Sequence, residues 1–278
     1  MTPTLRKLSD TFMKTLRLAN TIISMLVKER LFYPGRLLAD TMVVFARFGI
    51  LALLYRYVFE LRGGEILGVS FQAVAWSMFF YFALLVFKLG SVAREIMRDV
   101  QSGTVEVLFS KPVSYLWYRA VWQIGAGLYP FIFISVLGSV VLAYTIGIPA
   151  TLMTPLFLST IGIVLILGIV LILLLYISIG LLAFWMEDVN PVFWIVDKAV
   201  MILGGSYLPI ALFPPLMYQV ALWSPFGATY FITHTVYASW STLWLMLISI
   251  QAFWIAILCI VVATLFAMAR RNVSVNGG

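Results

Sequence analysis

The chain has 278 residues, of which 63% are hydrophobic and 10% carry a formal charge. Its mean hydropathy of +1.06 excludes a soluble globular protein, because no soluble core could hide that much apolar surface. The net charge of +7 resides mostly between the apolar segments, which indicates contact with anionic membrane lipids and argues against a nucleic-acid partner. We therefore expect a single all-α polytopic membrane domain over residues 1–278.

Residues 1–31 are predicted to form an amphipathic helix on the inner membrane surface. Apolar residues recur there at three- and four-residue steps, and most basic residues lie away from that stripe. The first 36 residues carry seven Lys or Arg without a continuous apolar run, which is not typical of a cleavable signal peptide. Pro34 and Gly35 would then turn the chain into the membrane. A topology anchor and a mechanical lever both remain open as roles.

Six apolar segments are long enough to cross a bilayer, which requires roughly 20 residues. They lie at 37–59, 69–88, 117–146, 154–184, 192–211 and 242–268. Fifteen of the eighteen basic residues fall in segments that would share a side with the amino terminus. Because Lys and Arg favour the cytosolic side, both termini are predicted to be cytosolic.

Arg47 lies in the middle of the first predicted span, where an arginine costs roughly 2.5 to 3.5 kcal/mol. Asp40 precedes it by seven residues, close to the same helix face, and could share its charge as an intramembrane pair. Alternatively, the long side chain snorkels toward the cytosolic headgroups. The sequence leaves both interpretations open.

The stretch "SVAREIMRDVQSG" predicts a short, exposed cytosolic helix over residues 91–103, between the second and third spans. Ser91 could cap its start, and Gly103 would end it. Val92, Ile96 and Val100 form an apolar stripe that suits the membrane surface or the groove of a partner. A merely solvated loop is an equally open interpretation.

The second cytosolic loop, "FWMEDVNPVFWIVDK", is short and acidic. Asn190 followed by Pro191 is a helix-start signal. Glu187 and Asp188 could contact a cytosolic partner, pair with the amino-terminal helix, or simply be solvated. Asp197 has no second carboxylate near it at membrane depth, which disfavours proton-driven transport.

Residues 204–241 contain four prolines and no acidic or basic side chain except His234. Such a segment on the outer side predicts re-entrant helices over 212–241, whose interrupted backbone must be satisfied by protein contacts. His234 has no ligand-type neighbours and is interpreted as an interfacial hydrogen-bonding residue. Cys259 is the sole cysteine, so it forms no internal disulfide.

The nucleotide-binding motif G-x-x-x-x-G-K-[ST] does not occur in the sequence. We therefore expect no cofactor on this chain, with ATP and Mg bound by a separate ATPase if the protein is ATP-driven. The sequence also lacks paired catalytic residues at matching membrane depth, which disfavours a membrane-embedded enzyme.

Several motifs occur in order along the chain: the charged short helix followed by Gly103, the run "KPVSYLWYR", the segment "LGGSYLPIALFPPLMYQVALWSPF" at 203–226, and the final "VNGG". In this order they resemble bacterial ABC-2 type permeases, and more narrowly the six-span ABC-2 family transporter proteins. Together with length and topology, the resemblance covers essentially the whole chain.

The resemblance implies the membrane subunit of an exporter with type V architecture, in the bacterial cytoplasmic membrane. Two six-span permeases would meet, with a heterodimer slightly favoured over a homodimer, and a pair of cytosolic ATPases would move them. The loop after the second span would be the coupling helix. The residues implied to couple to the ATPase are Glu95, Ile96, Arg98, Asp99, Gly103, Glu187 and Asp188. Spans two and five would line the path, with Phe79, Phe80, Val196 and Val200 as lining residues.

The sequence thus favours an exporter of a hydrophobic or amphipathic substrate. The alternative is a membrane scaffold or lipid scramblase that works without nucleotide.

Overall fold

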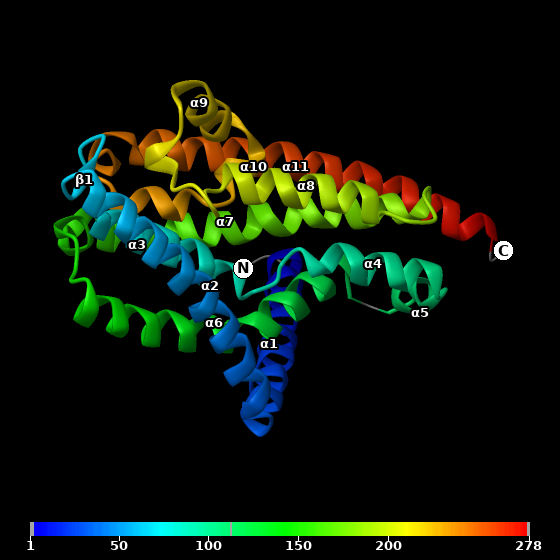
Figure 1. Ribbon diagram of the computed structural model, residues 1–278. Coiled ribbons are helices and arrows are strands. Elements are labelled where there is room, and N and C mark those ends of the chain that lie inside the picture. Colours follow the sequence, from blue (N-terminus) through cyan, green and yellow to red (C-terminus); the bar gives the residue numbers. More distant parts are fainter. Residues whose placement is uncertain (1–2, 112, 277–278) are drawn as a thin grey trace.

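The computed structural model describes residues 3–111 and 113–276, and helices dominate it (Figure 1). The α-helices are α1 Pro3–Phe32, α2 Pro34–Leu61, α3 Phe71–Leu85, α4 Ser91–Gln101, α5 Thr104–Phe109, α6 Tyr115–Thr145, α7 Pro155–Leu181, α8 Asn190–Leu203, α9 Pro215–Trp223, α10 Pro225–Ala228 and α11 Trp240–Asn276. The short 3-10 helices are η1 Ala150–Met153, η2 Leu182–Phe184, η3 Ile210–Leu212 and η4 Phe231–Val236. The chain is therefore mainly helical, as its composition predicts.

Four helical segments are long and apolar enough to cross a membrane. They are Pro34–Leu61, Tyr115–Thr145, Pro155–Phe184 and Trp240–Arg271. At 1.5 Å per residue, even the shortest exceeds the roughly 30 Å of a hydrocarbon core. These segments match the first, third, fourth and sixth predicted spans and indicate a multi-pass membrane protein.

The helices at the second and fifth predicted spans are shorter than predicted. α3 has 15 residues and α8 has 14, so each is only about 20 Å long. α8 ends before Gly204 and Gly205, and Gly205 takes a positive φ of 86°, a backbone conformation that glycine adopts without strain. The apolar composition continues to residue 211, which is why the hydropathy of the sequence overestimates this helix.

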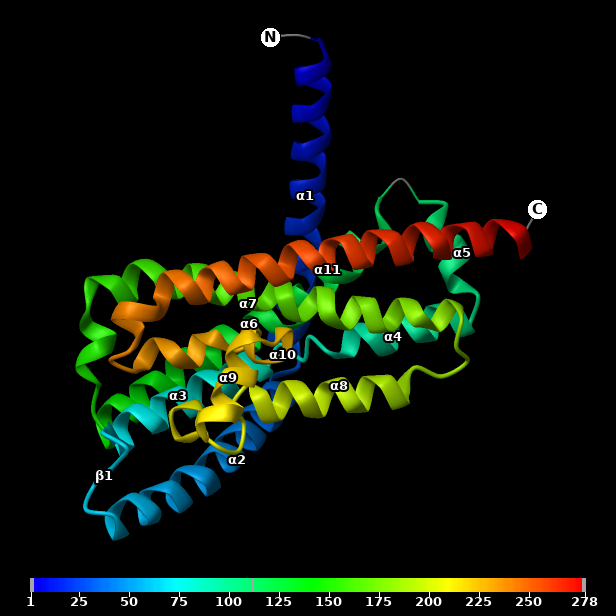
Figure 2. The same cartoon turned by 90° about the horizontal axis from the view of Figure 1, so that it is seen from above.

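The long helices α7 and α11 lie side by side, and α1 runs across their direction in both views (Figures 1 and 2). α1 packs on α6, where Ile22 and Leu26 are buried. Gly125 of α6 permits this contact, because a Cβ there would lie 2.9 Å from Leu26 Cδ1. The amino-terminal helix is thus present over its described residues. Its location on the membrane surface stays a prediction.

The two ends of the bundle differ in structure. One end gathers α4, α5, the α7–α8 connection and the carboxyl-terminal part of α11, on the right in Figures 1 and 2. The opposite end carries a hairpin of two short strands, β1 Glu65–Ile66 and β2 Val69–Ser70. Its turn residues Leu67 and Gly68 both have positive φ, as the central residues of a type I′ hairpin turn require. The all-α prediction missed this hairpin.

The segment over 204–241 consists of the short helices η3, α9, α10 and η4. Two side chains of α11 donate hydrogen bonds to its interrupted backbone: Gln251 Nε2 donates to the carbonyl of Ala228 (2.9 Å), and Trp254 Nε1 donates to that of Trp223 (3.0 Å). Such contacts are what a helix-broken apolar segment needs. Its depth in the outer leaflet stays a prediction.

Candidate coupling helix and membrane cavity

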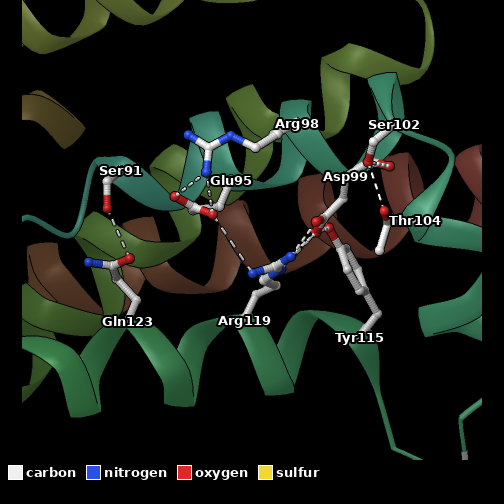
Figure 3. Close-up of polar contacts among 9 residues, drawn as sticks. All are labelled: Ser91, Glu95, Arg98, Asp99, Ser102, Thr104, Tyr115, Arg119 and Gln123. Carbon is white, nitrogen blue, oxygen red and sulfur yellow. Dashed lines mark hydrogen bonds and ion pairs between the residues drawn. The ribbon is translucent and has the colours of Figure 1, made fainter. Parts of the chain in front are cut away.

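α4 faces α6 with a row of polar residues at four-residue spacing. Ser91, Glu95 and Asp99 lie on one face of α4, and Tyr115, Arg119 and Gln123 lie on one face of α6 (Figure 3). Residues four apart in a helix are neighbours on its surface, so the two rows can meet along the full length of α4. Ser91 meets Gln123 while Asp99 meets Tyr115, so the two helices run in opposite directions.

The strongest contact in this row joins Asp99 to Arg119. Arg119 Nε donates to Asp99 Oδ2 at 2.8 Å, and Arg119 Nη2 also contacts the carboxylate. Tyr115 Oη donates to the same Oδ2 at 2.6 Å. The Asp99 and Arg119 side chains are only 9% and 14% exposed. Charge-assisted bonds between such shielded groups fix the last turn of α4 on α6.

The first turn of α4 is also fixed to α6. Ser91 Oγ lies 3.0 Å from Gln123 Oε1, and Gln123 Nε2 donates to the carbonyls of Phe87 and Lys88, both at 3.1 Å. Between these ends, Arg119 Nη1 lies 4.0 Å from Glu95 Oε2. The prediction that Ser91 caps α4 is therefore wrong, because its hydroxyl binds α6 and the capping position is Gly90.

The opposite face of α4 is buried against α7 and is not a free docking stripe. Val92, Ala93 and Ile96 are buried. Gly180 of α7 permits the close approach, because a Cβ there would lie 2.9 Å from Ile96 Cβ. The predicted apolar contact of Ile96 with a partner is wrong in this structure, since α7 of the same chain already covers that side chain. Asp99 is likewise engaged inside the molecule.

The carboxyl-terminal end of α4 agrees with the prediction, unlike its amino-terminal end. Gly103 has a φ of +70° directly after the helix, which confirms it as the terminating residue. The short helix α5 then begins at Thr104, which the sequence did not predict.

A polar surface, called here the docking face, joins the end of α4 to the α7–α8 connection. It consists of Arg98, Gln101, Ser102, Glu187 and Asp188, all exposed. Gln101 Nε2 donates to the carbonyl of Glu187 at 2.7 Å, which links the two loops. Arg98 is 70% exposed and pairs with Glu95 at 3.2 Å. Four predicted coupling residues, Glu95, Arg98, Glu187 and Asp188, thus lie on or beside this face.

The predicted helix start at Asn190 and Pro191 is confirmed, with Pro191 in the first turn of α8. Asn190 is the first residue of α8, and Val189 occupies the capping position without a side-chain cap. Asp188 Oδ1 accepts from the Asn190 backbone NH (2.8 Å) and from Asn190 Nδ2 (2.6 Å). The carboxylate of Asp188 therefore orders the loop that carries the docking face.

A cavity of about 490 Å³ lies among α2, the α3–α4 junction, α7 and α8. Its walls are mostly apolar, with Val43, Val44, Leu84, Ile172 and Met201 among them. Charged side chains from distant parts of the sequence also line it: Asp40, Arg47, Lys88, Arg94 and Asp197. The sequence prediction found no such charge cluster, because its members come from four different elements.

The predicted ion pair between Asp40 and Arg47 is not formed. Asp40 Oδ1 instead binds Lys88 Nζ at 2.8 Å, and Oδ2 lies 3.4 Å from Arg30 Nη1. Spacing within one helix could not reveal these partners, which come from α1 and the α3–α4 junction. Arg47 lies exposed on α2 and lines the cavity.

Only one of the four predicted path residues, Val200, lines this cavity. Phe79 is 2% exposed and packs in the bundle, with its ring centroid 6.0 Å from that of Phe48. Phe80 is stacked on Phe157 with centroids 6.3 Å apart. Aromatic residues of α3 therefore serve mainly in packing, and the lining role predicted for Phe79 is wrong in this structure. Val196 is partly exposed on α8.

Two further residues singled out in the sequence lie away from these sites. His234, in η4, is buried, and its Nε2 has no hydrogen-bond partner among the described residues. Cys259 is an exposed free thiol on α11. Within residues 3–111 and 113–276, no group of three or more His, Cys, Asp or Glu side chains could hold a metal ion.

Comparison with known proteins gives one family match. The family profile described as ABC-2 family transporter protein matches residues 46–277. No curated protein sequence matches the chain.

Proposed function

The chain belongs to the ABC-2 family of transporter proteins, the membrane permeases of ABC transporters, and we propose that it exports an amphipathic substrate, driven by a separate ABC ATPase. In this proposal the ATPase binds at the docking face. ATP and Mg are held by the ATPase in this proposal, which is supported by the lack of the nucleotide-binding motif in this sequence.

The observation that supports this proposal best is the double attachment of α4. Its polar face binds α6 and its apolar face packs on α7. A force applied at Arg98 or Gln101 therefore reaches two long helices at once without an intervening flexible segment. Packed side chains and ion pairs transmit such displacements because they do not deform continuously.

The cavity supplies a place for the substrate. It lies beside the first turn of α4, since Gly90, Ser91 and Arg94 line it. A volume of about 490 Å³ with apolar walls and a few polar groups is typical of a small-molecule site. Movement of α4 would therefore change the cavity directly.

We further propose that the working assembly contains two ATPases and a second permease in a bacterial cytoplasmic membrane. Two exposed apolar residues of α2, Ile50 and Leu53, fit either contact with a second permease or contact with lipid. A heterodimer is preferred over a homodimer by analogy with related permeases.

Photo-crosslinking tests the docking face. The chain is expressed together with its neighbouring genes, with a photoreactive amino acid replacing Arg98 in one variant and Leu67, in the hairpin at the opposite end, in a control. We expect the variant at position 98 to capture an ATPase that carries a nucleotide-binding motif, and the control to capture none. Capture at position 67 alone, or no ATPase at position 98, would contradict the proposal.

Transport of substrate across the membrane of vesicles that contain only this chain would instead support a scramblase.

A further inference from the structure

The charges around the cavity are unbalanced in favour of cations. Four basic side chains, Arg30, Arg47, Lys88 and Arg94, lie in it or bind its carboxylates, whereas only Asp40 and Asp197 are acidic. Asp40 is already shared by Arg30 and Lys88. Asp197 accepts a hydrogen bond of 2.9 Å from Tyr176 Oη. The two arginines that remain have no carboxylate of their own.

Arg47 and Arg94 are the two cations in question. Neither forms an ion pair with any acidic side chain in the described part of the chain. Arg94 lies over the ring of Phe193, with Cζ 4.5 Å from the centroid. A guanidinium that stacks on a ring keeps its in-plane N–H donors available, and such donors match the oxygens of carboxylate and phosphate.

The remainder of the wall is apolar. Val43 and Val44 of α2, Leu84 and Leu85 of α3, and Met201 of α8 line the same cavity. A free inorganic anion would leave these surfaces without a partner, whereas an acyl or other apolar chain would cover them.

We infer that the cavity binds an amphiphile whose anionic headgroup contacts Arg47 and Arg94 and whose apolar tail lies along α2 and α3. This inference rests on the proposed permease function and specifies the substrate class for it. Arg94 is one helical turn from Arg98 of the docking face, so the headgroup contact and the ATPase contact would share one rigid helix.

Binding to the purified full chain in neutral detergent tests the inference without any ATPase. The probe is a fluorescent short-chain phosphatidylglycerol, followed by anisotropy. A phosphatidylcholine of the same chain length and inorganic phosphate serve as competitors. We expect phosphatidylcholine to compete at least about tenfold more weakly than unlabelled phosphatidylglycerol, and phosphate not to compete at millimolar concentration.

Variants locate the binding site. Arg47→Gln and Arg94→Gln should each weaken binding of phosphatidylglycerol about tenfold, and Arg47→Lys should retain most of it. Arg56→Gln is the matched control, because Arg56 lies on the same helix but pairs with exposed Glu60 at 2.9 Å and lies outside the cavity. Size-exclusion profiles identify variants that fail to fold.

Three results would overturn the inference: equal competition by the two lipids, effective competition by phosphate, or unchanged binding in both glutamine variants. None of these results affects the crosslinking test of the docking face. A wrong substrate class can therefore be told apart from a wrong permease function.

Discussion

The contact of Asp99 with Arg119 and Tyr115 determines how α4 is held. An ion pair this shielded from solvent adds little net stability over an apolar replacement, because both ions lose their hydration. It does make the attachment specific, since removal of one member leaves an unpaired buried charge. Loss of either member therefore weakens the attachment of α4 to α6.

Arg119→Gln should thus destabilise the folded chain by about 3 kcal/mol, because it leaves Asp99 with Tyr115 as its remaining partner. Arg98→Gln is the matched control, since Arg98 also pairs with Glu95 but is largely exposed. Exposed pairs contribute little, so this change should remain within about 0.5 kcal/mol. Unfolding in a denaturing detergent titration measures both variants. Equal effects of the two substitutions would show that Asp99 does not depend on Arg119.

At this scale the sequence predicts backbone features better than side-chain partners. Gly103 and Pro191 were placed correctly because their conformations follow from their own covalent structure. The partners of Asp40 and Asp99 were not predicted, since they are tertiary neighbours from other helices or connections. Arg119 was missed as a functional residue, although its four-residue spacing from Tyr115 and Gln123 was a signal available in the sequence.

At the scale of elements, small residues decide which helices approach each other. Gly125 lets α1 contact α6, and Gly180 lets α4 contact α7. A side chain at either position would have to displace a neighbouring helix, because backbone or Cβ atoms lie within 3.3 Å of the new Cβ. The relative positions of α1, α4, α6 and α7 thus depend on these two glycines.

Gly180→Leu should move α4 away from α7 and loosen the transmission between the docking face and the bundle. We expect the complex with its ATPase to keep hydrolysing ATP while transport falls at least about tenfold. Gly162→Leu, at an exposed position of the same helix where no other part of the chain approaches the new Cβ within 4 Å, should leave both rates unchanged. ATP hydrolysis and transport are measured together in reconstituted vesicles. Equal transport in the two variants would argue that the α4–α7 contact is not needed for coupling.

Helix lengths show how far hydropathy can be used as a predictor. The four long spans were predicted to within about three residues at every end, because long apolar runs bounded by charges have few alternative structures. α3 was overestimated because the apolar run of the second span also covers strand β2 and the turn after Leu85. α8 was overestimated because hydropathy does not register the positive φ of Gly205 just after the helix. The hairpin between α2 and α3 is too short to give a periodic signal.

At the scale of the whole molecule, the predicted topology requires the docking face to lie on the cytosolic side of the membrane and the hairpin on the outer side. α4, α5 and the α7–α8 connection gather at the same end of the bundle, and the hairpin lies at the other (Figure 1). The order of segments and the family were accessible from the sequence. The cavity was not, because its charged residues are separated by up to 157 positions, from Asp40 to Asp197, and meet only when four elements pack.

Site-directed labelling with a membrane-impermeant maleimide tests this arrangement most directly. In a Cys259→Ser background, which removes the exposed native thiol, single cysteines replace Ser102 beside α4 and Leu67 in the hairpin. We predict that intact cells label the cysteine at position 67 but not that at 102, and that inverted membrane vesicles show the reverse. Labelling of position 102 from outside intact cells would contradict the account, because the docking face could then not meet a cytosolic ATPase.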